Sequence, residues 1–237
     1  MLLITRRARC SVPAMLSRLL VQITGKAAED VVLFVGTGAT AAANKLVHLL
    51  GLHLPPPPPL ESDLSGSSAQ CRPVVIVGPM EHHSNLLPWR ESYAEVVCVR
   101  AGLDGRVDLG HLEECLQAAQ GAPLICGSFS AASNVTGLVE RVDDVTAMLH
   151  AYGALSFWDY ATLAAYQAVD MNPTTLGTEH HGASLRKDAV FFSPHKFVGG
   201  ANTPGVLVAK KRLLANAVPA TQVGGGTVFY VTDESHR

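Results

Sequence analysis

The stretch Ser193-Pro194-His195-Lys196-Phe197-Val198-Gly199-Gly200 organises the chain, and it directly follows the apolar run Ala189-Val190-Phe191-Phe192. The apolar run predicts a short buried strand, which the serine and the proline end. Lys196 therefore lies just beyond the carboxyl end of a strand, among a histidine, a hydroxyl group and glycines. A lysine amine in such a place can form a Schiff base with a carbonyl compound or with pyridoxal phosphate. The alternative is an ordinary solvated surface charge, which is the usual setting of a lysine.

The composition is that of a folded globular protein, with 48% hydrophobic and 16% charged residues in 237 positions. These values allow a sizeable core and argue against disorder. The length permits one large α/β domain or two small ones. A net charge of -2 shows no basic excess, so we expect no nucleic-acid partner. No apolar run reaches the roughly 18 residues that span a bilayer, so we expect no membrane segment.

The cysteines are five in number and scattered, without a CxxC spacing (Cys10, Cys71, Cys98, Cys115, Cys126). This pattern predicts a reducing compartment such as the cytoplasm, with no disulfide framework and no metal site. Cys98 and Cys126 lie in apolar runs, and we expect both in the core. Residues 1–28 are rich in arginine and lack acidic side chains. They are compatible with a mitochondrial transit peptide or with an ordinary basic amphipathic helix.

Apolar runs predict strands at 31–35, 74–78, 96–99, 123–126, 154–158, 189–192 and 204–209. Helical patterns cover 41–50, 109–120 and 139–150. Because strands alternate with helices and are apolar throughout, we predict an α/β fold with three layers. It would be a mostly parallel sheet with helices on both faces. The 204–209 run follows the lysine strand too closely for a helical crossover, so this pair is predicted to be antiparallel.

Residues 54–70 form the one low-complexity segment, with five consecutive prolines followed by a serine-rich stretch. We interpret this segment as an exposed loop insertion with polyproline character. A docking site for a proline-recognising domain is the alternative, and a tolerated insertion is the simpler reading.

Polar residues follow the ends of the predicted strands, where an open α/β sheet binds its ligands. The Gly36–Thr40 stretch stands between a strand and a helix, so backbone N–H groups and the Thr40 hydroxyl could hold a phosphate. A simple helix cap is the alternative. The glycine spacing fits neither the dinucleotide fingerprint nor a P-loop, which disfavours a nucleotide-binding Rossmann protein.

Asp159 ends the predicted strand 154–158, and a carboxylate there can pair with a pyridinium nitrogen. His82 could lie on the face of a planar ring, and Asn134 could donate to a phenolate oxygen. Ser193 and His195 could reach a phosphate beside the lysine. Each of these residues could instead be an ordinary turn, cap or surface residue.

The polar motifs stand in a fixed order along the chain: Gly-Ala-Thr (38–40), Glu-His-His-Ser-Asn (81–85), Ser-Asn-Val-Thr-Gly (133–137), Asp159, the lysine octapeptide and Gly-Gly-Gly-Thr (224–227). This order resembles the class V aminotransferases. Within them it is most similar to the cysteine desulfurase-like branch of pyridoxal phosphate enzymes. The resemblance runs from about residue 31 to residue 227, and six ordered motifs make it specific.

The resemblance implies the large domain of the fold type I pyridoxal phosphate enzymes, a homodimer and an amino-acid substrate. Lys196, His82 and Asp159 would be the catalytic residues, with Lys196 forming the Schiff base, Asp159 on the ring nitrogen and His82 stacked on the ring. Thr227 would serve the cofactor of the partner subunit. The implied cofactor-binding residues are Gly38, Ala39, Thr40, His82, Asn134, Asp159, Thr162, Ser193, His195, Lys196 and Thr227.

The chain departs from the family pattern at two places. Desulfurases commonly carry Asp-x-Ala-Gln where this chain has Asp159-Tyr160-Ala161-Thr162, and the shorter Thr162 reaches less far towards a ring oxygen. Family members also continue into a small C-terminal domain that carries the carboxylate-binding arginine and, in desulfurases, the nucleophilic cysteine. We therefore expect residues 1–237 to form an incomplete large domain without that small domain. The resemblance implies a pyridoxal-phosphate-dependent aminotransferase or desulfurase-like enzyme; the alternative is a truncated non-catalytic homologue that binds the cofactor or only dimerises.

Overall fold

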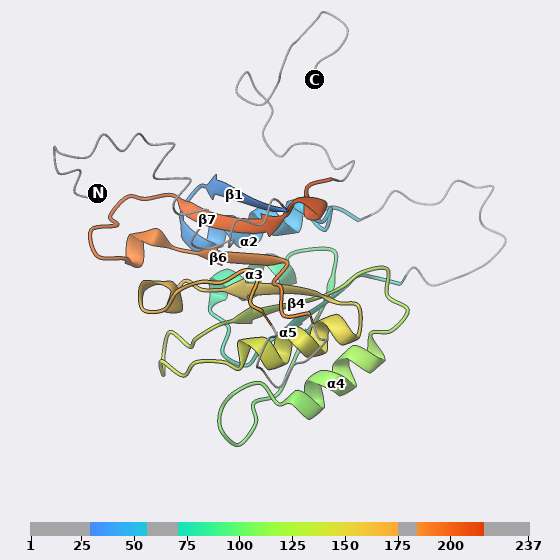
Figure 1. The fold of residues 1–237 in the computed structure, drawn as a ribbon. Coiled ribbons are helices and arrows are strands. Elements are labelled where there is room, and N and C mark those ends of the chain that lie inside the picture. The colour runs from blue at the N-terminus through green and yellow to red at the C-terminus, as the bar shows by residue number, and fades with distance from the viewer. Residues whose placement is uncertain (1–28, 56–70, 175–183, 216–237) are drawn as a thin grey trace, which may run out of the picture.

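The computed structural model describes residues 29–55, 71–174 and 184–215, which form an α/β structure around one seven-stranded sheet (Figure 1). The sheet order is β1-β7-β6-β5-β4-β2-β3. The strands are β1 (Asp30–Val35), β2 (Val74–Val77), β3 (Glu95–Cys98), β4 (Ile125–Ser130), β5 (Leu155–Asp159), β6 (Ala189–Phe192) and β7 (Gly205–Lys210).

The sheet is mostly parallel, as the sequence predicts. The pairs β3–β2, β2–β4, β4–β5 and β5–β6 are all parallel. Strand β7 runs antiparallel to both β6 and β1, with Phe192 opposite Val206 and Val35 opposite Gly205. The prediction that the lysine strand and its successor are antiparallel is therefore confirmed.

Helices cover both faces of the sheet: α2 (Gly38–Leu49), α3 (His83–Arg90), α4 (Leu109–Ala118) and α5 (Val142–Ala151). Alternate side chains of one strand point to opposite faces, so each strand contributes to two cores. In β6, Ala189 and Phe191 pack with α2 and α3, whereas Val190 and Phe192 pack with α4 and α5. Figure 1 shows α4 and α5 together on one side of the sheet. The three-layer prediction is confirmed.

Three predicted elements differ from the structure by three residues or more at one end, and the others differ by two residues or fewer. Strand β4 begins two residues later than expected and continues to Ser130, because its buried serine hydroxyls are hydrogen-bonded and so tolerate burial. Helix α2 begins at Gly38, three residues before the predicted start, so the Gly-Ala-Thr motif forms its first turn. Helix α5 begins at Val142 rather than at residue 139.

Helix α3 is absent from the sequence prediction, and one cysteine was misplaced. The α3 sequence contains Pro88 and lacks a clear apolar face, so periodicity gives no signal for it. Cys126 is buried as expected, but Cys98 is exposed because β3 is an edge strand.

Three predictions cannot be compared with the structure: the N-terminal residues 1–28, the insertion from residue 56 to residue 70, and Thr227 all lie outside the described residues. Among the described helices, none is long and apolar enough to cross a membrane.

Candidate active site

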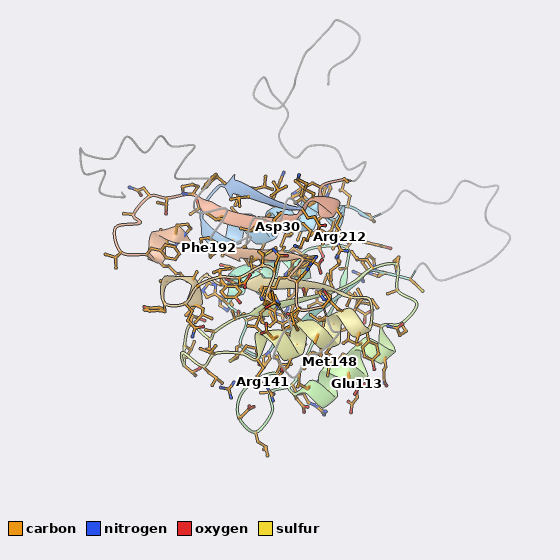
Figure 2. All side chains as sticks on the ribbon, viewed as in Figure 1. Asp30, Glu113, Arg141, Met148, Phe192 and Arg212 are labelled. Carbon is orange, nitrogen blue, oxygen red and sulfur yellow. The ribbon has the colours of Figure 1, made fainter. Side chains whose placement is uncertain are left out.

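One cavity of about 200 Å³ lies where the parallel strands β4, β5 and β6 end and helix α2 begins. We call it the Lys196 cavity. The structure brings together here the predicted site residues that it describes, and Thr227 lies outside the described part. Figure 2 labels Phe192, the last residue of β6, at the end of the sheet that carries this cavity. The predicted residues that line it are Gly38, Ala39, Thr40, His82, Asn134, Asp159, Thr162, Ser193, His195 and Lys196.

A larger cavity of about 570 Å³ lies at the opposite end of the sheet, near Arg212 (Figure 2). Four of the charged or titratable side chains that line it are already paired. Asp188 is bonded to Arg212 and lies 3.0 Å from His150, and the Lys210 ammonium group is 2.6 Å from a carboxylate oxygen of Asp30. Because these charges satisfy each other, we take the smaller Lys196 cavity as the candidate site.

The first turn of α2 forms one wall of the Lys196 cavity. Its N-cap residue, Thr37, makes no side-chain capping bond, and the Ser193 hydroxyl accepts the N–H of Ala39 at 2.8 Å instead. Gly38 has a positive φ of 59°, and a Cβ there would lie 2.8 Å from both the Ser193 hydroxyl and the His195 ring. The helix start is thus fitted against the loop after β6. Its N–H groups and dipole favour an anionic group.

His82 caps helix α3 and presents a neutral ring to the cavity. Its Nδ1 accepts the N–H of Ser84 at 3.1 Å, so the neutral ring carries its proton on Nε2. The hydroxyl of Ser84 lies 3.0 Å from the same Nδ1 and 2.7 Å from the Thr40 hydroxyl. Partial burial lowers the pKa of His82, and its electrostatic interactions with Lys196 and with the neighbouring His83 lower it further. The ring is therefore uncharged near neutral pH.

Asp159 is the last residue of β5 and is 4% exposed. Its Oδ1 accepts the N–H of Ala161 at 2.7 Å, and no ion pair holds it within the described residues. Burial raises the pKa of Asp159 to about 6, although the Ala161 bond and the Lys196 charge act against this shift. The cavity therefore contains a carboxylate that a cationic ligand group would stabilise.

Lys196 ends the short 3₁₀ helix Pro194–Lys196 that follows β6. The chain then turns back on itself, because the N–H of Phe197 bonds to the carbonyl of Pro194. A Cβ on Gly200 would come within 1.9 Å of the Pro194 carbonyl oxygen, so only glycine fits there. The lysine is exposed at the mouth of the cavity, and its charge reaches both Asp159 and His82.

Sequence reasoning missed three residues at this site. Ser84 and Ser130 line the Lys196 cavity, and Glu81 lies directly behind Ser130. The Glu81 carboxyl accepts bonds from Ser130 and Asn85, and burial raises its pKa to about 7. Glu81 stands next to His82 in the motif, which was the available signal. Ser130 had no signal, because its place depends on where β4 ends.

Comparison with known proteins identifies a family. The aminotransferase class-V family model matches residues 64–236. A probable cysteine desulfurase of Chlamydia muridarum is 36% identical over 167 residues, which cover 69% of this chain and 38% of the relative. The probable cysteine desulfurase 2 of Mycobacterium leprae is 30% identical over 213 residues, covering 88% of this chain and 44% of the relative. The chain thus spans less than half the length of these curated relatives.

Solved structures show the same fold at lower identity. The apo cysteine desulfurase of Thermococcus onnurineus superposes with a TM-score of 0.66 at 20% identity, covering 98% of this chain and 53% of that one. The cysteine desulfurase CsdA of Escherichia coli gives a TM-score of 0.65 at 22% identity, with the same coverage of 98% and 53%. At these identities the likeness establishes the α/β architecture alone.

Proposed function

The chain belongs to the class V aminotransferase family, and from this premise we propose that it binds pyridoxal phosphate in the Lys196 cavity and uses it to act on an amino acid. The observation that carries the proposal is the layout of charge in that cavity. The start of helix α2 and the Ser193 and Thr40 hydroxyl groups line the cavity together with the buried Asp159 carboxylate and the Lys196 amine.

This layout fits the cofactor. A phosphate group suits the first turn of α2, where Gly38 leaves no side chain in the way. A pyridinium nitrogen suits Asp159, because a cation beside a buried carboxylate offsets the cost of its burial. The uncharged His82 ring suits stacking on a planar aromatic group, which such pairs favour by about 1 kcal/mol.

When bound, the cofactor supplies an aldehyde for the amine and a ring that accepts the electron pair left by a broken Cα bond. The chain's own residues do the rest. In our proposal the Lys196 amine would hold the cofactor by its aldehyde carbon, with loss of water, until the substrate amine displaces it, and the freed Lys196 amine would then accept the proton from the substrate Cα. Asp159 keeps the proton on the ring nitrogen, and the α2 turn with Ser193 and His195 fixes the phosphate. Asn134 and Thr162 line the same cavity and would be available to bond the ring substituents.

L-Cysteine is the first substrate to test, because the similar curated proteins are named as cysteine desulfurases. Among the described residues, no cysteine lines the Lys196 cavity. Cys126 is fully buried in β4, and burial raises the pKa of its thiol far above the usual range. A buried thiol of this kind is a poor nucleophile. In our proposal the described residues therefore bind the cofactor and accept the proton from the substrate Cα. None of the described cysteines is placed to accept sulfur from the substrate.

We further propose that the partner at the cavity mouth is a second copy of this chain. Three large apolar side chains are strongly exposed: Val135, Tyr166 and Val198. Each stands within four positions of a cavity-lining residue along the chain. Exposed large apolar groups close in sequence to a site favour a protein contact there. Sedimentation of the wild type beside a Val135→Ser, Val198→Ser variant tests this: a weaker dimer is expected, and unchanged association contradicts it.

The experiment that tests the function uses the whole chain loaded with pyridoxal phosphate. Exchange of the Cα proton of L-cysteine and L-alanine into D₂O is followed by NMR for wild type, Lys196→Ala and Lys211→Ala. Lys211 is an exposed lysine outside the cavity and serves as the matched control. We expect exchange with wild type and the control, and none with Lys196→Ala. Cofactor binding without any exchange would instead favour the non-catalytic homologue.

A further inference from the structure

The Glu81 carboxyl group is held by three hydrogen bonds from neighbouring elements. Its Oε1 accepts the backbone N–H of Ser130 at 2.8 Å. Its Oε2 accepts the Ser130 hydroxyl at 2.7 Å and the Asn85 amide at 2.5 Å. Gly78 leaves the space for this carboxyl, because a Cβ there would lie 2.8 Å from Oε1. The group is therefore enclosed and oriented, although the residue as a whole is only half-buried.

Two of the three bonds have a fixed direction. A backbone N–H can only donate, which fixes the bond from Ser130 N. The Asn85 Oδ1 accepts the indole N–H of Trp89 at 3.2 Å and the Ser128 hydroxyl at 2.6 Å, so its NH₂ group must face Glu81. The Ser130 hydroxyl is the one partner in this set that can either donate to Glu81 or accept from it.

Ser130 links Glu81 to the Lys196 cavity. It ends β4 directly opposite Asp159 in the parallel register with β5, and both residues line the cavity. The next N–H, of Ala131, donates to the backbone carbonyl of Asp159 at 2.9 Å. A change in the Ser130 hydroxyl or its partner therefore occurs at the strand end that also holds Asp159.

The charge of Asp159 affects the protonation of Glu81. Burial raises the pKa of Glu81 to about 7, its bonds to Ser130 and Asn85 lower it, and the charge of Asp159 raises it again. Burial raises the pKa of Asp159 to about 6. Among the other titratable groups, Lys196 acts on Asp159, and His82 and His195 line the same cavity. Glu81 thus holds its proton to a higher pH than Asp159 does.

We propose that Glu81 is a positioning residue that, through the Ser130 hydroxyl, sets the negative charge available to the cofactor ring beside Asp159; this rests on the proposed function. When Glu81 is protonated, its O–H donates to Ser130, whose own hydrogen can turn towards the cavity. When Glu81 loses that proton to solvent, Ser130 donates to it, and a second negative charge stands behind the ring.

The test is the pH dependence of the absorbance of the pyridoxal phosphate-loaded protein between pH 5 and pH 9. Ionised Glu81 favours retention of protons on the bound cofactor, so Glu81→Gln should move the spectral midpoint to lower pH, by on the order of one unit. Ser130→Ala should move it in the same direction, because losing this hydroxyl keeps Glu81 protonated to higher pH. Ser128→Ala is the matched control: the same change in the same strand, at a hydroxyl that reaches Glu81 only through Asn85, whose amide the Trp89 indole still orients.

Two results would overturn the inference: a Glu81→Gln midpoint equal to that of wild type, or equal shifts for Ser130→Ala and Ser128→Ala. The cofactor-free protein gives an independent measurement. Urea denaturation at pH 5 and pH 8 is compared for wild type, Glu81→Gln, Asp159→Asn and the double variant. Coupled carboxyls predict non-additive pH effects, and additive effects contradict the inference. A protein that fails to bind the cofactor refutes the proposed function, while this second measurement still decides the coupling.

Discussion

Replacement of Asp159 by asparagine should stabilise the empty protein at alkaline pH and weaken its hold on the cofactor. Asp159 is 4% exposed, and burial raises its pKa from 3.8 to about 6. The folded state therefore binds the proton more tightly than the unfolded chain does. The stability that this proton contributes is complete below pH 3.8 and is lost as the pH rises through about 6. Asparagine keeps an oxygen for the Ala161 N–H and removes the buried charge.

The shift of about two pKa units corresponds to roughly 3 kcal/mol over the whole window. Between pH 5 and pH 8, the linkage relation gives about 1.4 kcal/mol. We therefore compare urea denaturation of the two cofactor-free proteins at pH 5 and at pH 8. The free energy of unfolding of Asp159→Asn minus that of wild type should be about 1.4 kcal/mol larger at pH 8 than at pH 5.

Added pyridoxal phosphate should reverse the order of the two proteins. A ligand that binds only the folded state raises stability with its concentration over Kd, and wild type should bind more tightly because its carboxylate pairs with the ring nitrogen. At pH 8, saturating cofactor should therefore raise the unfolding midpoint of wild type more than that of Asp159→Asn. Parallel pH profiles for the empty proteins would refute the buried-charge reasoning, and equal cofactor effects would refute the placement of the ring nitrogen.

Three further expectations follow from the Lys196 cavity. Borohydride reduction of the loaded protein should label Lys196, and peptide mapping that finds the label on the buried Lys187 would refute the assignment. His82→Ala should weaken cofactor binding by about 1 kcal/mol through lost stacking, whereas His83→Ala should not. The cofactor that each variant retains after dialysis is measured by absorbance. A larger loss with His83→Ala would mean that His83, and not His82, stacks on the ring. Gly38→Ala should lose about 1–2 kcal/mol from its positive φ alone and should also impair cofactor binding; unchanged denaturation would contradict the fitted helix start.

The strands could be predicted because their interiors are continuous apolar runs. The lysine strand Ala189–Phe192 has the same bounds in the sequence prediction and in the structure. The buried end of β4 could not be predicted in this way, since Ser128 and Ser130 are polar. Their burial depends on partners more than 40 positions away, Asn85 and Glu81. A local apolar pattern contains no information about such partners.

Helix α3 shows a different limit. Its eight residues include Pro88, and propensity disfavours a proline inside a helix. The helix forms because His82 caps its first turn and Trp89 packs into the core beside Phe157, with ring centroids 6.1 Å apart. Both contacts are particular to this tertiary arrangement, so intrinsic propensity predicts a loop here.

The site followed from motifs, whereas the contacts that assemble it did not. The motifs supplied Lys196, Asp159 and His82, because strand ends gather at one edge of an α/β sheet. The capping of α2 by Ser193 joins residues 154 positions apart. No spacing rule reaches across that distance. The roles of the motif residues remain the proposal that the experiments above test.

The buried carboxylate of the Lys196 cavity has fewer bonding partners than the other buried carboxylates of the described residues. Asp30 pairs with Lys210 at 2.6 Å, and Asp188 pairs with His150 at 3.0 Å, as expected where burial would otherwise be costly. Asp159 is as deeply buried, yet within the described residues it has no ion pair and accepts a single backbone bond. Glu140, which is also buried without an ion pair, accepts two backbone N–H bonds, from Val107 and Arg141. Asp159 therefore has the fewest partners of these buried acids, and it lines the cavity that also contains Lys196 and the start of α2. The buried, unpaired charge of Asp159 destabilises the empty protein. A ligand with a cationic ring nitrogen would pair with Asp159, and its anionic group would bind at the start of α2.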